Sequence, residues 1–152
     1  MPEGPEVKIS TDFLKKNVTK INSINIESLP YKKKFSQVIN IANKHLTEKA
    51  SFFCIGKNIF LKLSKKNNLH IHLGMTGSFT FKKQKHNHLS FSTPNGKIFF
   101  NDIRRFGFTR IISDETIHLK FNKIIDILNE NYDITTHINL LNNISGNLEI
   151  CK

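Results

Sequence analysis

The chain has 152 residues, and Lys and Arg outnumber Asp and Glu by 23 to 12, which gives a net charge of +11. At about 150 residues per domain this length predicts one domain, and a hydrophobic fraction of 38% excludes a disordered chain. The charge predicts attraction to polyanions, although abundant Lys, Asn and Ile indicate an AT-rich coding sequence that explains part of it.

Other function classes are excluded by simple counts. Two cysteines are too few for a disulfide framework or a Cys-rich zinc site. No apolar run reaches the roughly 18 residues that a membrane span needs, and the acidic, proline-containing start differs from a secretory signal. We therefore expect a soluble, intracellular protein with no membrane partner.

Hydrophobic spacing predicts a helix at the start of the chain, where Pro5 suits a first turn and Val7, Thr11 and Leu14 recur at helical intervals. A short strand is expected over 21–26 and a helix over 35–46. Beyond them, short runs of alternating apolar residues separated by turn signals are typical of a β-sandwich or barrel. Strands are expected at 59–63, 69–73, 79–81, 89–91, 98–100 and 106–112.

This pattern predicts a mainly β fold with flanking helices, and specifically a two-sheet antiparallel β-sandwich. Phe60 and His70 alternate with the apolar residues of their strands and are expected on the opposite face. Helical spacing returns after Asp114, with Phe121, Ile124, Ile125 and Leu128 on one stripe, and a further apolar stretch covers 134–144. The predicted organisation is a sandwich domain over 1–115 and a short helical tail over 116–152.

The N-terminus is a candidate reactive group. Methionine before a small residue such as Pro2 is commonly removed, which exposes a secondary amine. An α-amino group has a pKa near 7.7–8.0, so about a quarter to a third of it is neutral at pH 7.4, compared with about 0.1% of a lysine. It is therefore a nucleophile that needs little activation, and the adjacent Glu3 and the nearby Glu6 could move protons. Alternatively, these residues simply begin a helix.

Six motifs occur in order along the chain: MPEGPEV at the start, Gly56-Lys57, the segment HIHLGMTG over 70–77, KHNH over 85–88, NGK over 95–97 and DIRRFG over 102–107. This series resembles the N-terminal catalytic domain of the formamidopyrimidine-DNA glycosylase/endonuclease VIII family of base-excision repair enzymes. The resemblance covers about residues 2–113. It implies a bifunctional DNA glycosylase/AP lyase that acts on damaged DNA.

The resemblance also implies roles for residues in this sequence. Pro2 would attack C1′ of the damaged nucleotide, Glu3 would donate the proton that opens the sugar, and Glu6 would support the site. Lys57 would lie near the scissile phosphate and assist β-elimination. The residues implied in contacting DNA or filling the space of the flipped base are His72, Met75, His86, Arg104, Arg105 and Phe106.

The chemistry of these residue types agrees with the implied roles. A base must leave the stack before it can be excised, and apolar wedges such as Met75 and Phe106 offset part of that cost. Arg can hydrogen-bond the orphaned base, and two of only three arginines, Arg104 and Arg105, adjoin Phe106. Alternatively, Met75 and Phe106 are core residues and Lys57 is a solvated charge.

Two further alternatives concern the histidine pairs and the glycines. The pairs at 70/72 and 86/88 could hold zinc, but no acidic or cysteine partner accompanies them, so we expect no metal. The Gly74-x-x-Gly77 segment is similar to the loop of KH domains, which joins helices, whereas this one is expected to join strands.

The family resembled here continues into a helix-two-turns-helix domain and a zinc or zincless finger. One interpretation of the tail over 116–152 is a truncated start of that helical domain, with 125–128 as its degenerate entry, and we expect no counterpart of the finger or of its arginine. We therefore expect no zinc cofactor and no δ-elimination, and a second chain or domain that supplies the other DNA-binding half is one interpretation. The other two interpretations are that the chain is a fragment of a longer protein and that it is a reduced member of the family. The alternative function is a truncated, non-catalytic DNA-binding module, favoured by the charge.

Overall fold

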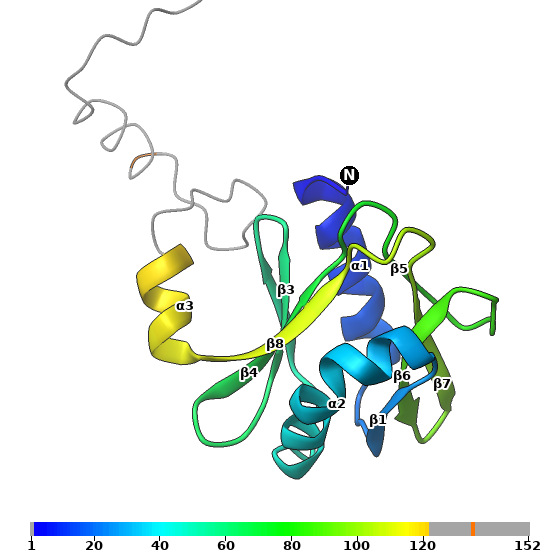
Figure 1. Ribbon diagram of the computed structural model, residues 1–152. Helices are drawn as coiled ribbons and strands as arrows, with labels where there is room; N and C mark the ends of the chain where they lie inside the picture. The colour runs from blue at the N-terminus through cyan, green and yellow to red at the C-terminus, as the bar shows by residue number, and fades with distance from the viewer. Residues whose placement is uncertain (1, 122–134, 136–152) are drawn as a thin grey trace, which may run out of the picture.

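The computed structural model describes residues 2–121 and residue 135. Within these residues, two four-stranded antiparallel sheets pack face to face and helices flank them (Figure 1). The first sheet has the order β1-β6-β7-β5 and the second β2-β3-β4-β8. The elements are α1 (Gly4–Asn17), β1 (Ser23–Ile26), α2 (Leu29–Lys44), β2 (Phe52–Ile55), β3 (Asn58–Lys62), β4 (Asn67–His72), β5 (Ser78–Thr80), β6 (Asn87–Thr93), β7 (Gly96–Asn101), β8 (Phe108–Ser113) and α3 (Asp114–Phe121).

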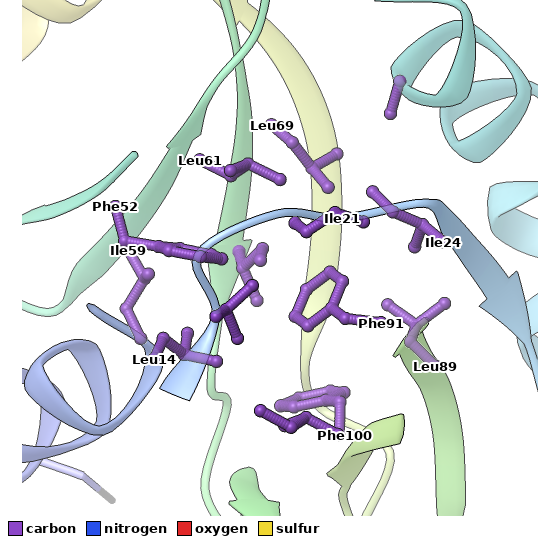
Figure 2. Packing of buried hydrophobic residues seen from close by; sticks show 14 of the residues in the cluster. Leu14, Ile21, Ile24, Phe52, Ile59, Leu61, Leu69, Leu89, Phe91 and Phe100 are labelled. Atoms are coloured by element: carbon purple, nitrogen blue, oxygen red, sulfur yellow. The ribbon is translucent and has the colours of Figure 1, made fainter. Parts of the chain in front are cut away.

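The predicted antiparallel β-sandwich is confirmed. Its core lies between the sheets, where Phe91 of β6 and Phe100 of β7 meet Ile59 of β3 and Leu69 of β4, all at most 2% exposed (Figure 2). Leu14 closes the core from α1, as the helical spacing at the start predicts. Because both sheets contribute large apolar side chains, the loops at their ends stand on a rigid base.

Helix α2 begins earlier than the sequence predicts. The apolar spacing places its start near Phe35, whereas the helix begins at Leu29 and includes Pro30 in its first turn. Proline is tolerated there because the first turn needs no backbone N–H donor, and Ser28 precedes it as the N-cap residue. The apolar pattern gives no sign of this turn, because its main buried member is Tyr31.

The second sheet is covered on both faces, which the alternation rule does not predict. Alternation places Phe60 and His70 on the face opposite Ile59 and Leu69, and their exposed fractions on that face are 0% and 1%. Helix α3 lies over them, and its Ile117 and Phe121 pack against Phe60 to form a small second cluster. The alternation is correct, and a helix buries the second face, which the alternation alone does not reveal.

Other expectations fall partly outside the described residues. The stripe through Ile124, Ile125 and Leu128 and the apolar stretch over 134–144 lie there, and the proposed division at residue 115 stays a prediction. Among the described residues, no helix is long and apolar enough to cross a membrane.

Candidate active site and nucleic-acid interface

Four segments that are distant in the sequence lie at one end of the sandwich: the N-terminus, the β2–β3 turn, the β4–β5 loop and the β7–β8 loop (Figure 1). All the predicted site residues except His86 belong to these segments or to the strand and helix ends beside them. The fold therefore gathers five of the six motifs at this end, although the sequence spreads them over about a hundred residues. The sixth, NGK over 95–97, lies in the β6–β7 turn at the opposite end of β7.

The N-terminal residues contact the β2–β3 turn through an ion pair. The Nζ atom of Lys57 lies 2.5 Å from Oε2 of Glu3, and both side chains are partly exposed. Lys57 stands in a two-residue turn whose first residue, Gly56, has a φ of 53°, a conformation that suits glycine. Glu6 accepts a hydrogen bond of 2.9 Å from the backbone N–H of Glu3, and the half-buried Pro2 precedes this pair.

His72 lies at the end of β4, near Lys57, and is half-buried. Burial, with the nearby charges of Lys57 and Arg110, lowers the pKa of this imidazole. Its Nδ1 accepts the backbone N–H of Gly74 at 3.0 Å, so the neutral ring carries its proton on Nε2. The ring stacks on Phe108 at 5.0 Å, which fixes its plane. His72 can therefore donate a hydrogen bond to an anion without being charged.

A hydrogen-bonded chain of side chains, with the buried His70 at its centre, supports the Lys57 turn. Arg110 Nε can only donate, so its 3.0 Å contact makes Nδ1 of His70 the acceptor and leaves the ring proton on Nε2. That proton is donated to Oδ1 of Asn58 at 2.8 Å, and Asn58 donates to the carbonyl of Ile55 at 3.2 Å. Burial and Arg110 lower the pKa of His70 to about 4. This chain clamps both ends of the turn that carries Lys57.

The β4–β5 and β7–β8 loops touch through their backbones. A Cβ atom added at Gly74 would lie 2.5 Å from both the backbone nitrogen of Gly107 and the carbonyl carbon of Phe106. Gly74 also has a φ of 65°, so both contact and conformation require glycine. This contact places Met75 beside the loop that carries Arg104 and Phe106.

The β7–β8 loop is organised by the fully buried carboxylate of Asp102. Its Oδ1 accepts the hydroxyl of Thr76 at 2.6 Å and its Oδ2 accepts the backbone N–H of Gly107 at 2.7 Å. The hydroxyl of Tyr31 donates to the carbonyl of Gly107 at 3.1 Å, and burial beside Asp102 raises the pKa of Tyr31 above its usual range. The carboxylate thus ties the loop to β4–β5 and to α2.

The tip of this loop projects into solvent. Phe106 is 54% exposed and Met75 is 40% exposed, so the alternative that they belong to the core does not hold. Arg104 is exposed and lies over the Phe106 ring, 5.1 Å from its centroid. Arg105 is also exposed and has a φ of 58°, which is costly for a residue other than glycine. An exposed pair of apolar side chains with two arginines is suited to contact bases and phosphates.

His86 lies at the base of the same loop, in the β5–β6 connection, where its carbonyl accepts the backbone N–H of Asp102 at 3.0 Å. His88 donates from Nε2 to the carbonyl of Asp102 at 2.9 Å, and Nδ1 contacts the hydroxyl of Ser28. Burial lowers the pKa of His88. Among the described residues, no three His, Cys, Asp or Glu side chains gather as metal ligands.

The residues that sequence reasoning missed are those that hold the loops. Asp102 stands out in the sequence only as part of a motif, and Tyr31, Thr76 and Asn58 have no role assigned by any pattern. A buried aspartate at the end of a strand, followed by exposed arginines, is the one signal that points to such a hub. The partners of Asp102 come from other elements and carry no pattern of their own.

The fold is an antiparallel β-sandwich with its N-terminus and a basic, apolar loop at the same end. Its class of domain is given by a protein-family model, that of the formamidopyrimidine-DNA glycosylase N-terminal domain, which matches residues 1–109. Formamidopyrimidine-DNA glycosylase of Rickettsia africae (strain ESF-5) is 31% identical over 131 residues, covering 80% of this chain and 47% of the relative. That of Rickettsia bellii (strain OSU 85-389) is 28% identical over 149 residues, covering 88% and 52%.

Solved structures agree with the sequence comparison. MutM in complex with carbocyclic 8-oxo-G containing DNA has a TM-score of 0.66 at 25% identity, covering 80% of this chain and 48% of that one. Lactococcus lactis Fpg in complex with an abasic site containing DNA has a TM-score of 0.64 at 25% identity, covering 80% and 47%. The chain belongs to the formamidopyrimidine-DNA glycosylase family through that family's N-terminal domain. It spans about half the length of these relatives.

Proposed function

We propose that the chain is a base-excision-repair DNA glycosylase with AP lyase activity, whose nucleophile is the N-terminal amine of Pro2. The observation that carries the proposal is the 2.5 Å contact between Glu3 and Lys57. It places a cation suited to a phosphate beside Glu3, the proton-transfer group that follows the nucleophile. The relatives and solved neighbours, which include proteins bound to damaged DNA, support the same assignment.

The proposed reaction needs only groups at this end of the sandwich. The Pro2 nitrogen forms a bond to C1′ while the bond from C1′ to the damaged base breaks, and the base leaves with that electron pair and takes up a proton. Glu3 accepts the proton that the attacking amine loses and donates it to the ring oxygen as the sugar opens. The resulting iminium has no N–H to lose, so it stays cationic and draws electrons from the C2′–H bond. Water accepts the C2′ proton, and β-elimination releases the 3′ phosphate. Lys57 keeps its proton and supplies a positive charge beside Glu3 for the phosphate.

The DNA-facing residues have separate tasks in this proposal. His72 donates its Nε2 proton to a phosphate oxygen beside Lys57, and His86 contacts the backbone from the β5–β6 side. Met75 and Phe106 occupy the space left by the extruded nucleotide, which offsets a few kcal/mol of unstacking. Arg104 hydrogen-bonds the orphaned base, for which its planar guanidinium is suited. The enzyme would act wherever its DNA lies inside the cell.

Borohydride trapping on an oligonucleotide with an abasic site tests the nucleophile. The chain lacking Met1 is expected to give a covalent adduct, and intact mass first establishes that Met1 is removed. The matched control carries a Gly-Ser extension before Pro2, which turns the amine into an amide and leaves every other residue unchanged. Equal trapping by the extended chain, or none by the processed one, would contradict the proposal.

A non-catalytic DNA-binding module is the competing function, and the charge of +11 favours it. It differs from the enzyme in its response to Glu3→Gln. For the enzyme, this substitution should abolish excision of a damaged base and keep both binding and trapping on a preformed abasic site. A binding module should show neither excision nor trapping, and salt-sensitive binding that is indifferent to changes at Pro2 and Glu3.

A further inference from the structure

A basic cleft lies between the first turns of α2 and the β7–β8 loop, and we call it the α2 cleft. It has a volume of about 320 Å³. Tyr31 and Phe35 form an apolar wall, with their rings in edge-to-face contact at 5.0 Å. The residues that line it are Pro30, Tyr31, Lys34, Phe35, Arg104, Arg105 and Gly107.

The charge of the α2 cleft has one sign. Lys34, Arg104 and Arg105 line it, and none of them forms an ion pair with a carboxylate among residues 2–121. The nearest acid along the loop, Asp102, is fully buried and its oxygens are taken by Thr76 and Gly107. Three cations at one cleft repel each other, and an anion between them removes that repulsion.

The walls of the α2 cleft are already fixed. Tyr31 holds the carbonyl of Gly107 at 3.1 Å, and the Tyr31 ring stacks on His88 at 4.5 Å. Arg105 keeps its left-handed backbone, and its N–H donates to the carbonyl of Asp102 at 3.3 Å. A conformation that costs about 1–3 kcal/mol persists only where its surroundings determine it. Binding in this cleft therefore requires little ordering of the protein backbone.

The position of the α2 cleft indicates which part of the DNA would reach it. Helix α1, which carries the proposed nucleophile, packs on β2, β3 and β5, whereas α2 packs on β1 and β8. The two helices thus flank different sides of the interface. Arg104 lines the α2 cleft and also lies over Phe106, the proposed wedge. A nucleotide next to the orphaned base would continue from Arg104 into the cleft.

We propose that the α2 cleft binds a backbone phosphate of the strand opposite the damaged nucleotide, held by Lys34 and Arg105. This proposal rests on the proposed function, because it takes the β7–β8 loop as the element that enters the DNA. A phosphate between a lysine and an arginine is a common form of contact, with Arg supplying directed donors and Lys a point charge. The site would hold the second strand while chemistry proceeds on the first.

Lys34→Gln tests the contact, and Lys33→Gln is its matched control. Lys33 is also exposed, stands one residue earlier on α2 and does not line the cleft. Binding to a duplex with an abasic-site analogue is measured against salt concentration. Loss of one phosphate contact should make the slope of log K against log salt shallower by about 0.9 for Lys34→Gln, and by less than half of that for the control. Equal slopes for the two variants would overturn the proposal.

A single-stranded oligonucleotide with the same analogue then tests the strand. Lys34→Gln should weaken binding to the duplex several-fold and leave binding to the single strand at the wild-type value. Equal weakening on both substrates would place the phosphate on the damaged strand and overturn the proposal. In a further set of duplexes, a neutral methylphosphonate replaces one phosphate at a time along the opposite strand. At one position, Lys34→Gln and the wild type should bind the duplex with equal affinity.

These outcomes are separable from those of the proposed function. Borohydride trapping of the single-stranded abasic oligonucleotide needs Pro2 and does not involve Lys34. Lys34→Gln should therefore trap that substrate at the wild-type rate. If the unmodified chain fails to trap at all, the proposed chemistry is wrong, while the duplex-dependent salt effect of Lys34 still reports on the cleft.

Discussion

Asp102 illustrates how one residue can determine a surface that it does not touch. Its carboxylate is fully buried and accepts hydrogen bonds from Thr76 and Gly107, on two different loops. Thr76 in turn accepts the backbone N–H of Arg104 at 3.1 Å. The exposed side chains on the β7–β8 loop are thus held by buried polar groups, which cost free energy when they lose a partner.

Thr76→Val tests this connection, because valine has nearly the same shape and neither donates nor accepts. The hydrogen bonds to Asp102 and from Arg104 are lost, and the free energy of unfolding should fall by about 1–2 kcal/mol. Binding to an abasic duplex should weaken several-fold, since the loop is no longer held. Urea unfolding and fluorescence anisotropy measure the two effects.

Thr93→Val is the matched control. The Thr93 hydroxyl also makes two hydrogen bonds, both with backbone groups, at the end of β6 beside the β6–β7 turn and outside the β7–β8 loop. It should lose less stability and bind the duplex as the wild type does. If Thr93→Val reduces binding as much as Thr76→Val, the loop network is not the cause.

His70 makes the fold sensitive to acid. Its pKa is lowered from 6.5 to about 4 in the folded chain, mainly by burial. Between these values the unfolded chain takes up a proton that the folded chain refuses, so stability falls as the pH drops from 6.5 towards 4. The slope from this group reaches about 1.4 kcal/mol per pH unit. The lowered pKa values of His72 and His88 act in the same direction.

His70→Phe should remove much of this dependence. Phenylalanine keeps a ring in the stack on Phe60, but cannot titrate. Urea midpoints measured between about pH 4.5 and 6.5 should change less with pH than those of the wild type. At about pH 8 the histidine is neutral in both the folded and the unfolded chain. The difference in urea midpoint between variant and wild type at that pH therefore reports only the hydrogen bonds that Asn58 and Arg110 have lost. An unchanged slope in the variant would show that His70 is not the group responsible.

At the scale of elements, the two loops that build the interface are joined by backbone contact. Gly74→Ala places a methyl group 2.5 Å from the backbone nitrogen of Gly107, in a residue with positive φ. The loops must separate, and we expect a loss of about 2–4 kcal/mol with a marked loss of duplex binding. Chemical unfolding and anisotropy titration measure these effects.

Gly96→Ala separates the effect of the positive φ from the effect of the close contact between the loops. Gly96 also has a positive φ, 123°, but nothing lies within 4 Å of its added Cβ. It should cost about 1–2 kcal/mol from conformation alone and leave binding intact. Should Gly74→Ala cost no more than Gly96→Ala, the close approach of the loops carries no energetic weight.

The sequence predicts elements better than it predicts what covers them. Alternation in β3 and β4 is a local property, and both strands form where it indicates. The burial of Phe60 and His70 depends on α3, which returns over the sheet about 50 residues later, so no local pattern contains it. The start of α2 is missed for a different reason. Ser28 and Pro30 are helix-start signals, but they precede the apolar spacing that places the helix.

The candidate site divides in the same way. Short motifs identify the reactive residues, because chemistry needs particular residue types. Motifs do not identify their support, because the contacts that hold them join distant elements: Tyr31 bonds to Gly107 across 76 positions, and Asn58 to His70 across two strands. Hydrogen bonds of that kind depend on the assembled fold, and a single sequence carries no trace of them.

For the whole molecule, the net charge of +11 and the placement of cations make different predictions about DNA binding. If the surface bound DNA through all its lysines, affinity would fall extremely steeply with salt. Among the described residues, four cations line the α2 cleft or pair with Glu3, namely Lys57, Lys34, Arg104 and Arg105. Most other lysines of the described residues are exposed and do neither.

Three to four phosphate contacts predict a slope of about −3 in a plot of log K against log salt. Affinity for an abasic duplex should then fall by about 40- to 150-fold between about 50 and 200 mM salt. A slope of about −7 or steeper would mean that scattered lysines carry the binding and that the interface has been placed wrongly. A slope of about −3 that becomes shallower with Arg105→Gln, and not with Lys33→Gln, would locate the binding charge at the end of the sandwich where the N-terminus lies.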